Sequence, residues 1–293
     1  MKNETFKRIT VVLIILLLGT AVSYAGADNG AAFKGVPVFM LCGALAFIVN
    51  WAAFVPANRA QTEKYYDLMG SATYLSVIAV AIVLTPELSL RAKLAALMVI
   101  VWTLRLGTFL FMRINQDGQD DRFDEIKTSP LRFFITWNLQ ALWVLFTSAC
   151  ALVVITSVNK SPMELIGYIG ILMWIIGLAI EVVADSQKRI FKQKAENKGR
   201  FINVGLWSWS RHPNYFGEIT LWTGMAFLAI PILSGLQWFT LISPLFVFLL
   251  LTKVSGVPLL AQKGQDRWGD EPEYQAYLKQ TSLLIPMPPK KNQ

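Results

Sequence analysis

The sequence predicts an all-α fold, a polytopic membrane bundle of transmembrane helices, and three observations support this. Of the 293 residues, 54% are hydrophobic and 16% are charged, and the mean hydropathy is +0.46, which is more apolar surface than a water-soluble domain can bury. Apolar runs of about 20 residues, the length that crosses the hydrocarbon core of a bilayer, recur along the chain. Most Lys and Arg residues lie in the polar loops between these runs.

Eight apolar runs are long enough to be membrane spans. The last seven are predicted to form one bundle of seven core helices, because no Gly-rich linker or internal repeat divides the chain. The eight runs cover approximately residues 9–25, 36–56, 68–86, 91–112, 131–156, 164–184, 216–234 and 236–254.

The first run has two interpretations. Lys7 and Arg8 precede a short apolar run, and the small residues 19-GTAVSYAGA-27 follow it, which is also typical of a cleavable signal peptide. Residues 1–28 are therefore either a signal peptide or an additional N-terminal transmembrane helix. Residues 29–293 form the main transmembrane domain.

The loop charges predict which side of the membrane each loop occupies. One set of loops has little more than Lys34 and Lys160, whereas the other set carries most of the basic residues. Because basic loops stay on the cytoplasmic side, the basic set is predicted to be cytoplasmic. The net charge of +8 is thus interpreted as a topology signal, and no nucleic-acid partner is expected. The basic loops are the N-terminus, 57–67, 113–130, 185–215 and the tail after 254.

The supply of metal-binding side chains is small. Cys42 and Cys150 both lie in apolar runs, and His212 is the single histidine. These residues do not provide the ligands of a typical zinc or iron site. We therefore expect no metal, and two buried thiols in place of a disulfide.

The sixth span continues into a charged segment, 181-EVVADSQKRIFKQK-194, so the helix is predicted to extend beyond the membrane. Glu181, Asp185, Arg189 and Lys192 are spaced by four, four and three residues, which places them on one helix face. Acidic side chains at membrane depth need a compensating partner and favour a functional role. The alternative is a salt-bridged helix end, which accounts for the cations but not for Glu181.

The next segment, 203-NVGLWSWSRHPNYFGE-218, predicts a helix that begins near Pro213, with Ser210 or His212 near its cap. The free backbone N–H groups at a helix start form an anion site suited to phosphate or pyrophosphate. The basic side chains expected to support this site are Arg200, Arg211 and His212.

Two further polar residues follow on the same predicted helix. Asn214 and Glu218 are four residues apart and would share one face, where they are natural partners for ribose hydroxyls or a carboxamide. The segment therefore predicts a nucleotide-like cofactor. The alternative is an interfacial anchor formed by Trp207, Trp209 and Tyr215, which leaves Asn214 and Glu218 unexplained.

These residues resemble a known family. The segments 209-WSRHPNYFGEITLWTGM-225, 254-VSGVPLLAQK-263 and 274-YQAYLKQTSLLIP-286 resemble the DUF1295 group of bacterial membrane proteins, in the steroid 5-alpha-reductase-like superfamily. The resemblance covers nearly all of the chain after about residue 40. Isoprenylcysteine carboxyl methyltransferases, phospholipid methyltransferases and sterol reductases have related Arg-His-x-x-Tyr-x-Gly segments. The resemblance thus implies a bacterial inner-membrane enzyme whose cofactor site faces the cytoplasm.

The resemblance also implies a cofactor. Steroid 5-alpha-reductases hold NADPH with an Asn- or Asp-containing helix, a basic run and an Asn-x-x-x-Glu pair, although Glu181 stands where they usually have Asn. Methyltransferases use the same cleft for S-adenosylmethionine, which lacks phosphates, so the density of cations favours NADPH. The implied NADPH-binding residues are Asp185, Arg189, Lys192, Arg200, Arg211, His212, Asn214, Tyr215 and Glu218.

The resemblance implies that the segment 61-QTEKYYDLMGSATY-74 binds the carbonyl end of the substrate, which we call the reacting end. In the reductases, a Gln-Glu pair and a later Tyr hydrogen-bond the carbonyl oxygen of the substrate, where negative charge develops. The resemblance aligns Tyr66 and Asp67 with that pair, and Tyr65 is a further catalytic candidate. A carboxyl group in apolar surroundings keeps its proton, so Asp67 could donate it. The alternative for both tyrosines is an interfacial aromatic belt. Gln61 and Glu63 lie close to this pair, so the alignment of Tyr66 and Asp67 with the Gln-Glu pair of the reductases stays open.

The remaining substrate-binding candidates lie in the fourth and fifth spans. Trp102 falls near the position of the later Tyr of the reductases. Arg105 lies inside the fourth span and needs a partner there, for which Asp67 or the cofactor is expected. Asn138 and Gln140 either line the same cavity or hold helices together by hydrogen bonds.

The leading hypothesis is an NADPH-dependent reductase that transfers hydride to the C4–C5 double bond of a 3-oxo-4-ene steroid or a similar hydrophobic enone. The first alternative is an S-adenosylmethionine-dependent methyltransferase of the same superfamily, acting on a lipid or a prenylated thiol. The second is a lipid-binding bundle without activity. The expected partners are a hydrophobic steroid-like or lipid substrate and membrane lipids.

Overall fold

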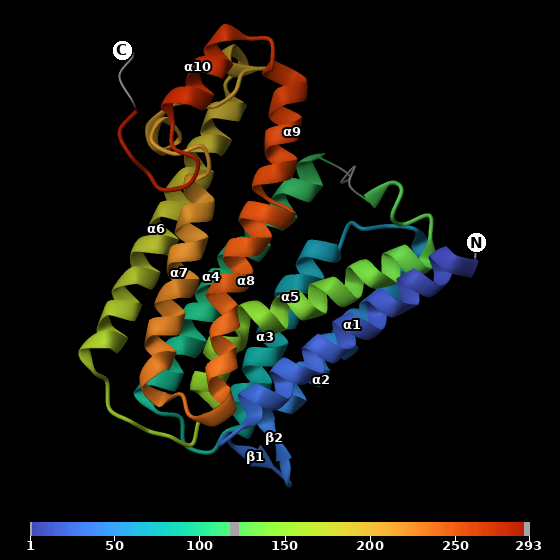
Figure 1. Cartoon of the computed structure of the whole chain (residues 1–293), viewed down its shortest axis with the longest axis vertical. Coiled ribbons are helices and arrows are strands. Elements are labelled where there is room, and N and C mark those ends of the chain that lie inside the picture. The colour runs from blue at the N-terminus through green and yellow to red at the C-terminus, as the bar shows by residue number, and fades with distance from the viewer. Residues whose placement is uncertain (1, 118–122, 290–293) are drawn as a thin grey trace. The chain divides into compact units, whose positions relative to one another are not determined.

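The computed structural model describes residues 2–117 and 123–289, which are mostly helical (Figure 1). Among these residues, eight helical segments are long and apolar enough to cross a membrane, which confirms the predicted polytopic bundle. The protein is therefore an integral membrane protein. The segments are Asn3–Ala27, Val38–Ala60, Tyr66–Leu84, Leu90–Met112, Pro130–Thr156, Leu165–Gln193, Pro213–Ile232 and Gly235–Trp268.

Each predicted span overlaps one of these segments, and most ends agree to within a few residues. The sixth helix continues to Gln193, as its charged extension predicted. The last span was predicted to end at residue 254. The π-helical turn Leu250–Val254 ends at that residue, and a separate helix, Val257–Trp268, follows after a bend at Ser255 and Gly256.

The chain forms two compact units. Unit 1 comprises Met1–Gly167 and Ala226–Ser243, and unit 2 comprises Tyr168–Met225 and Pro244–Gln293.

Unit 1 is built around helix α5, whose residues from Gln140 to Thr156 are almost all buried. Helices α1 to α4 and the 3₁₀ segment η5 all contact α5. The elements are α1 (Lys2–Ala27), β1 (Ala32–Phe33), β2 (Val36–Pro37), α2 (Val38–Ala60), α3 (Tyr66–Leu84), α4 (Leu90–Asp117), α5 (Pro130–Thr156), η4 (Ile230–Ile232) and η5 (Gly235–Leu241).

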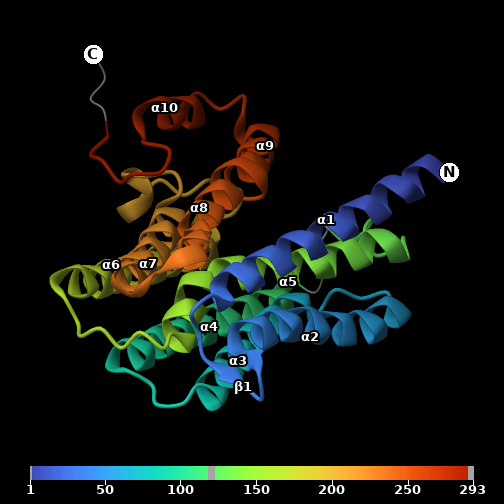
Figure 2. The same ribbon diagram turned by 60° about the horizontal axis from the view of Figure 1, so that its bottom comes forward.

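Helices α1 and α2 contact each other and approach closely through small residues (Figures 1 and 2). A Cβ atom added to Gly19 would lie 2.6 Å from the ring of Phe47. Gly26 faces the ring of Phe39 in the same way, and Gly43 leaves room for the side chain of Ser23. After α1, the carboxylate of Asp28 accepts a hydrogen bond from the N–H of Leu236 at 2.8 Å.

A buried hydrogen-bond network links α2, α3 and α5. The amide of Gln140 donates to the side chain of Asn50 and to the main-chain oxygen of Tyr66, both at 3.0 Å. Asn50 in turn donates to Thr73 at 3.1 Å. Gln140 thus holds helices together, which is one of the two roles predicted for it.

Unit 2 contains most of helices α6 (Leu165–Gln193) and α7 (Pro213–Ala229), which run side by side (Figure 1). A Cβ atom on Gly217 would lie 2.6 Å from the oxygen of Gly177 and 2.7 Å from the nitrogen of Glu181, so the two backbones touch. Only glycine permits this approach. The other elements are η2 (Ala195–Asn197), η3 (Gly205–Ser208), α8 (Ile242–Leu249), η6 (Leu250–Val254), α9 (Val257–Trp268) and α10 (Pro272–Gln280).

Candidate functional site

The turn that leads into α7 lies within unit 2. Helix α7 begins at Pro213, as predicted, and the oxygen of His212 accepts its first hydrogen bond, from the N–H of Phe216 at 3.2 Å. The hydroxyl of Ser210 accepts a hydrogen bond from the N–H of His212 at 3.1 Å and donates to the oxygen of Leu284 at 2.7 Å. Ser210 thus fixes the turn from both sides.

Three side chains of this turn carry buried polar atoms that have no hydrogen-bond partner among the described residues. These atoms are Nε of Arg211, Nδ1 of His212 and Oδ1 of Asn214. The Nδ2 of Asn214 donates to Oδ1 of Asp185 on α6 at 3.2 Å. Burying a polar atom without a partner costs about 1–3 kcal/mol, so three such atoms within four residues indicate a place for a polar ligand.

The electrostatics of the turn are dominated by cations. Burial, and then the positive charges of Lys188 and Arg211, together lower the pKa of His212 to about 4. At neutral pH, His212 therefore takes part as a neutral imidazole, and its ring stacks on that of Tyr215. An anion at this turn would be attracted by Arg211 and Lys188, with His212 as a neutral hydrogen-bonding group.

The structure brings together part of the predicted cofactor set. Asp185 and Asn214 are hydrogen-bonded, Arg211, His212 and Tyr215 form the turn, and Glu218 lies half-buried one helical turn further along α7. The remaining members, Arg189, Lys192 and Arg200, are exposed.

Sequence reasoning missed two residues of α6 that contact the loop before the turn. Lys188 lies 4.7 Å from the ring centre of Trp207, and the side chain of Gln187 accepts a hydrogen bond from the N–H of Leu206 at 2.9 Å. The spacing from Asp185 to Lys188 is one that shares a helix face, and it could have identified Lys188. The role of Gln187 depends on loop folding and had no sequence signal.

A small cavity in unit 1 contains Asp67 and Trp102, two of the predicted reacting-end residues. Its volume of about 20 Å³ is room for one water molecule or one substrate oxygen atom. Two of its lining groups, the hydroxyl of Thr103 and the indole N–H of Trp143, are buried without a partner among the described residues. Neither was predicted. The other lining residues include Ser71, Tyr74 and Gln140, so Gln140 has both of its predicted roles.

The two predicted tyrosines lie elsewhere in unit 1. Tyr65 and Tyr66 line a separate, mainly apolar groove of about 550 Å³, together with Met69, Trp137 and small residues of α2. The hydroxyl of Tyr66 donates to the oxygen of Thr136 at 2.9 Å. Adjacent residues on a helix point about 100° apart, so Tyr66 and Asp67 face different cavities.

Two other substrate-binding predictions fall outside both cavities. Asn138 accepts a hydrogen bond from the indole of Trp51 at 3.0 Å, which is the helix-linking role. The guanidinium of Arg105 lies over the ring of Phe109 at 5.8 Å.

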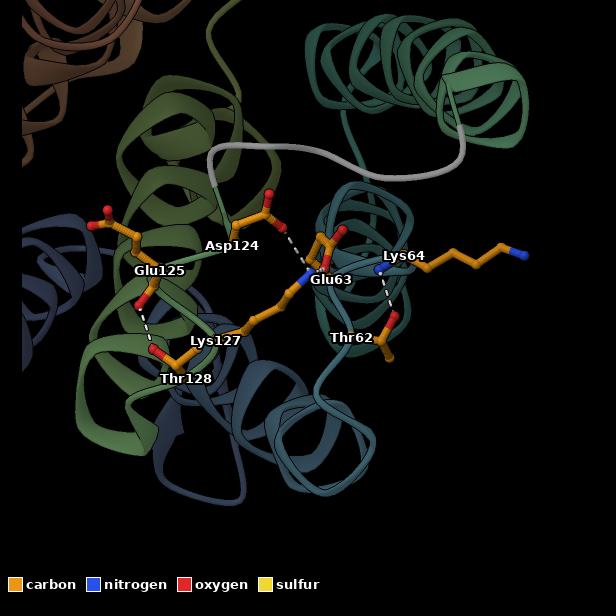
Figure 3. A network of polar contacts seen from close by, with 7 residues as sticks. All are labelled: Thr62, Glu63, Lys64, Asp124, Glu125, Lys127 and Thr128. Atoms are coloured by element: carbon orange, nitrogen blue, oxygen red, sulfur yellow. Dashed lines mark hydrogen bonds and ion pairs between the residues drawn. The ribbon is translucent and has the colours of Figure 1, made fainter.

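Gln61 and Glu63 are the two residues that left the alignment of the catalytic pair open, and the structure shows where both lie. Glu63 is only 6% exposed and forms a salt bridge with Lys127 at 3.0 Å, and Lys127 also contacts Asp124 at 3.1 Å (Figure 3). The hydrogen bond to Glu63, followed by that to Asp124, raises the pKa of Lys127. Gln61 bonds back to its own helix at Asn58. Of the three acidic or amide candidates in this segment, Asp67 alone lines either cavity.

The described residues contain no group of three or more His, Cys, Asp or Glu side chains placed to hold a metal ion. The two units thus define a polytopic membrane protein with a polar, cation-rich turn in one unit and, in the other, a small, mainly apolar cavity that several polar side chains line. Residues 53–281 match the model of a family described as "Protein of unknown function (DUF1295)", and the chain belongs to this family. This confirms the predicted family.

One curated relative is the "Probable O-methyltransferase ustE" of Ustilaginoidea virens. It is 34% identical to this chain over 69 residues, which are 23% of the chain and 24% of the relative. The similarity thus spans a minor part of either protein. No solved structure matches the chain.

Proposed function

We propose that the protein is an NADPH-dependent membrane reductase that saturates the C4–C5 double bond of a 3-oxo-4-ene steroid or a similar hydrophobic enone. The observation that carries this proposal is the turn before α7. Arg211, His212 and Asn214 each hold a buried polar atom without a partner among the described residues, and Lys188 and Arg211 create a positive potential there.

The residues of the turn before α7 and of the end of α6 fit the phosphate groups of a dinucleotide. The α-helix α7, of 17 residues, places the positive end of its dipole at the turn, and Arg211 and Lys188 supply charge for the phosphates. The exposed cations of the α6 end suit an additional phosphate, which NADPH carries and S-adenosylmethionine lacks. Asn214, Asp185 and Glu218 offer amide and carboxylate groups for ribose hydroxyls or a carboxamide. When bound, NADPH would supply the hydride.

The small cavity of unit 1 fits the carbonyl end of the substrate. Thr103 and Trp143 have unused hydrogen-bond donors there, and Asp67 in its protonated form would donate to the same oxygen. The donors would stabilise the negative charge that develops on that oxygen during reduction. The apolar groove beside Tyr65 and Tyr66 supports a hydrophobic ligand, because its lining is mainly small and aromatic side chains.

The location of the turn is also part of the proposal. The segment 185–215 that contains it carries many of the basic residues, and basic loops stay in the cytoplasm. A cofactor site at this loop would therefore draw on the cytoplasmic NADPH pool of a bacterial inner-membrane protein.

A methyltransferase is the second candidate. Its support is the similarity to the relative named as a probable O-methyltransferase. In that case, S-adenosylmethionine would occupy the turn, and the acceptor would be a lipid or a prenylated thiol.

Turnover measurements separate the two functions. Protein purified in detergent should oxidise NADPH in the presence of progesterone and yield the ketone whose C4–C5 bond is saturated. Asn214→Ala should raise the Kd of NADPH about tenfold by removing a polar partner, whereas the exposed-loop control Asn159→Ala should not.

The substrate end has its own variant. Asp67→Asn should lower kcat about a hundredfold and leave the Kd of NADPH unchanged, as expected for loss of a proton donor. Methyl transfer from S-adenosylmethionine without any NADPH-dependent product would refute the reductase.

A further inference from the structure

The C-terminal segment of the chain lies directly against the turn before α7. The N–H of Arg211 donates to the oxygen of Ser282 at 2.8 Å, and the N–H of Met287 donates to the oxygen of Trp209 at 3.0 Å. Ser210 and Ser282 form a parallel β-bridge. We call residues 281–287 the C-terminal strap.

Ser210 is the side chain that joins the strap to the turn. It is completely buried, and its one hydroxyl proton is donated to the oxygen of Leu284 while its oxygen accepts the N–H of His212. A hydroxyl group has one donor, so this arrangement uses it fully. The hydroxyl oxygen of Ser210 is therefore bonded both to the strap and to the residue that precedes α7.

Helix α10 anchors the strap at its other end. The hydroxyl of Tyr277 donates to the oxygen of Trp207 at 2.7 Å, and burial raises the pKa of Tyr277, which keeps this donor protonated. The rings of Tyr277 and Tyr274 pack on Phe201. The loop is thus joined to α10 at Trp207 and to the strap at the three successive residues 209, 210 and 211.

The consequence for the site follows from a count of hydrogen bonds. The strap bonds to the main-chain oxygen of Trp209 and to the N–H of Arg211, whereas the side-chain atoms of Arg211, His212 and Asn214 identified above remain without partners among the described residues. The strap determines the conformation of the turn, and it leaves the ligand-binding atoms available.

We propose that Ser210 is a positioning residue for the cofactor and that the C-terminal strap is an integral part of the cofactor site. The proposal rests on the proposed cofactor-binding function of the turn. Because the strap and the cofactor act on the same turn, their binding is thermodynamically linked: each should stabilise the other.

The first test measures nucleotide affinity. NADPH and S-adenosylmethionine are each titrated against the full-length protein in detergent, and the Kd of the one that binds is compared among variants. Ser210→Ala should weaken binding about tenfold, because it leaves the oxygen of Leu284 and the N–H of His212 without a partner. Ser210→Thr keeps the hydroxyl and should restore most of the affinity.

Ser208→Ala is the matched control. Ser208 lies in the same loop, but its hydroxyl bonds to Gly205 in its own turn and not to the strap. This variant should bind the nucleotide as the wild type does. If Ser208→Ala and Ser210→Ala weaken binding equally, general loop damage explains the effect and the proposal is wrong.

The second test follows the strap itself by hydrogen exchange. Saturating nucleotide should slow amide exchange in peptides that contain Met287 at least threefold in the wild type, and less in Ser210→Ala. A strap whose exchange does not respond to nucleotide would overturn the linkage, even if the variants are stable.

The outcome also separates this proposal from the reductase assignment. If S-adenosylmethionine binds and NADPH does not, the reductase fails, and the same comparison of Ser210 variants decides the strap with the other nucleotide. If neither binds the wild type, both proposals fail. If NADPH binds but Ser210→Ala changes neither its Kd nor strap exchange, the strap proposal alone fails.

Discussion

At the scale of single residues, His212 shows how burial changes the chemistry of a side chain. Its pKa falls from the ordinary 6.5 to about 4, first because burial disfavours the charged imidazolium and then because Lys188 and Arg211 repel it. Between pH 6.5 and 4, the unfolded chain therefore binds a proton at this residue that the folded chain does not. The stability that neutral His212 maintains above pH 6.5 is lost progressively as the pH falls towards 4.

We expect this single group to lower the free energy of unfolding by about 2 kcal/mol between pH 7.5 and 5. Thermal unfolding in detergent at both values should show a larger loss for the wild type than for His212→Gln, which cannot titrate. Equal losses would show that folding does not lower the pKa of His212.

Arg91 is a buried residue of unit 1 with a structural task. It is 2% exposed, and its guanidinium donates to the oxygens of Leu228 and Pro162, both at 2.7 Å. Arg91→Met would leave both oxygens without this partner and should destabilise the protein by about 3 kcal/mol. Lys93→Met, an exposed neighbour on the same helix, should change stability by less than about 0.5 kcal/mol. Similar unfolding temperatures for the two variants would contradict this role.

The residue scale also shows a limit of sequence reasoning. The sequence could identify Asp67 as a polar residue at a span entrance, but pairing it with Tyr66 took two neighbours as one functional unit. On a helix these neighbours face different cavities, and a one-dimensional alignment does not contain that direction. Thr103 and Trp143 were missed because a threonine or tryptophan in an apolar span is ordinary until its donor is found without a partner.

At the scale of elements, the contact between α6 and α7 depends on glycine. Gly217→Ala would place a Cβ atom 2.6 Å from the oxygen of Gly177, and the helices would have to separate. We expect a loss of about 1–3 kcal/mol of stability and weaker nucleotide binding, because the hydrogen bond between Asp185 and Asn214 crosses the same contact.

Gly70→Ala is a suitable control for that measurement. Its Cβ would meet only the side chain of Gln140, at 3.3 Å or more. Melting temperature and nucleotide Kd of both variants check the prediction. A Gly217→Ala protein as stable as Gly70→Ala would mean that the helices are not in backbone contact.

The contacts of helix α1 bear on whether residues 1–28 are retained or cleaved. Gly19 and Gly26 fit against the rings of Phe47 and Phe39, and Asp28 bonds to the N–H of Leu236. These contacts favour the transmembrane-helix interpretation of residues 1–28. We therefore predict that the intact mass of protein purified from membranes includes these residues, and a mass that lacks them would support the signal peptide.

At the scale of the whole molecule, the bundle was predictable because membrane spans are determined by local composition. A run of about 20 apolar residues can be recognised from its own composition, without knowledge of the rest of the fold. The start of α7 was equally local, since Pro213 follows potential cap residues. The strap was not predictable, because each of its contacts with the turn uses a main-chain atom of the strap, which any sequence can supply, and joins residues about 70 positions apart.

The central claim is that the turn before α7 binds NADPH. Its most direct test is calorimetric titration of the purified wild-type protein, in parallel, with NADPH and with S-adenosylmethionine. We predict saturable NADPH binding that weakens about tenfold in Asn214→Ala, and no comparable binding of S-adenosylmethionine. Tight binding of S-adenosylmethionine with no detectable binding of NADPH would contradict it.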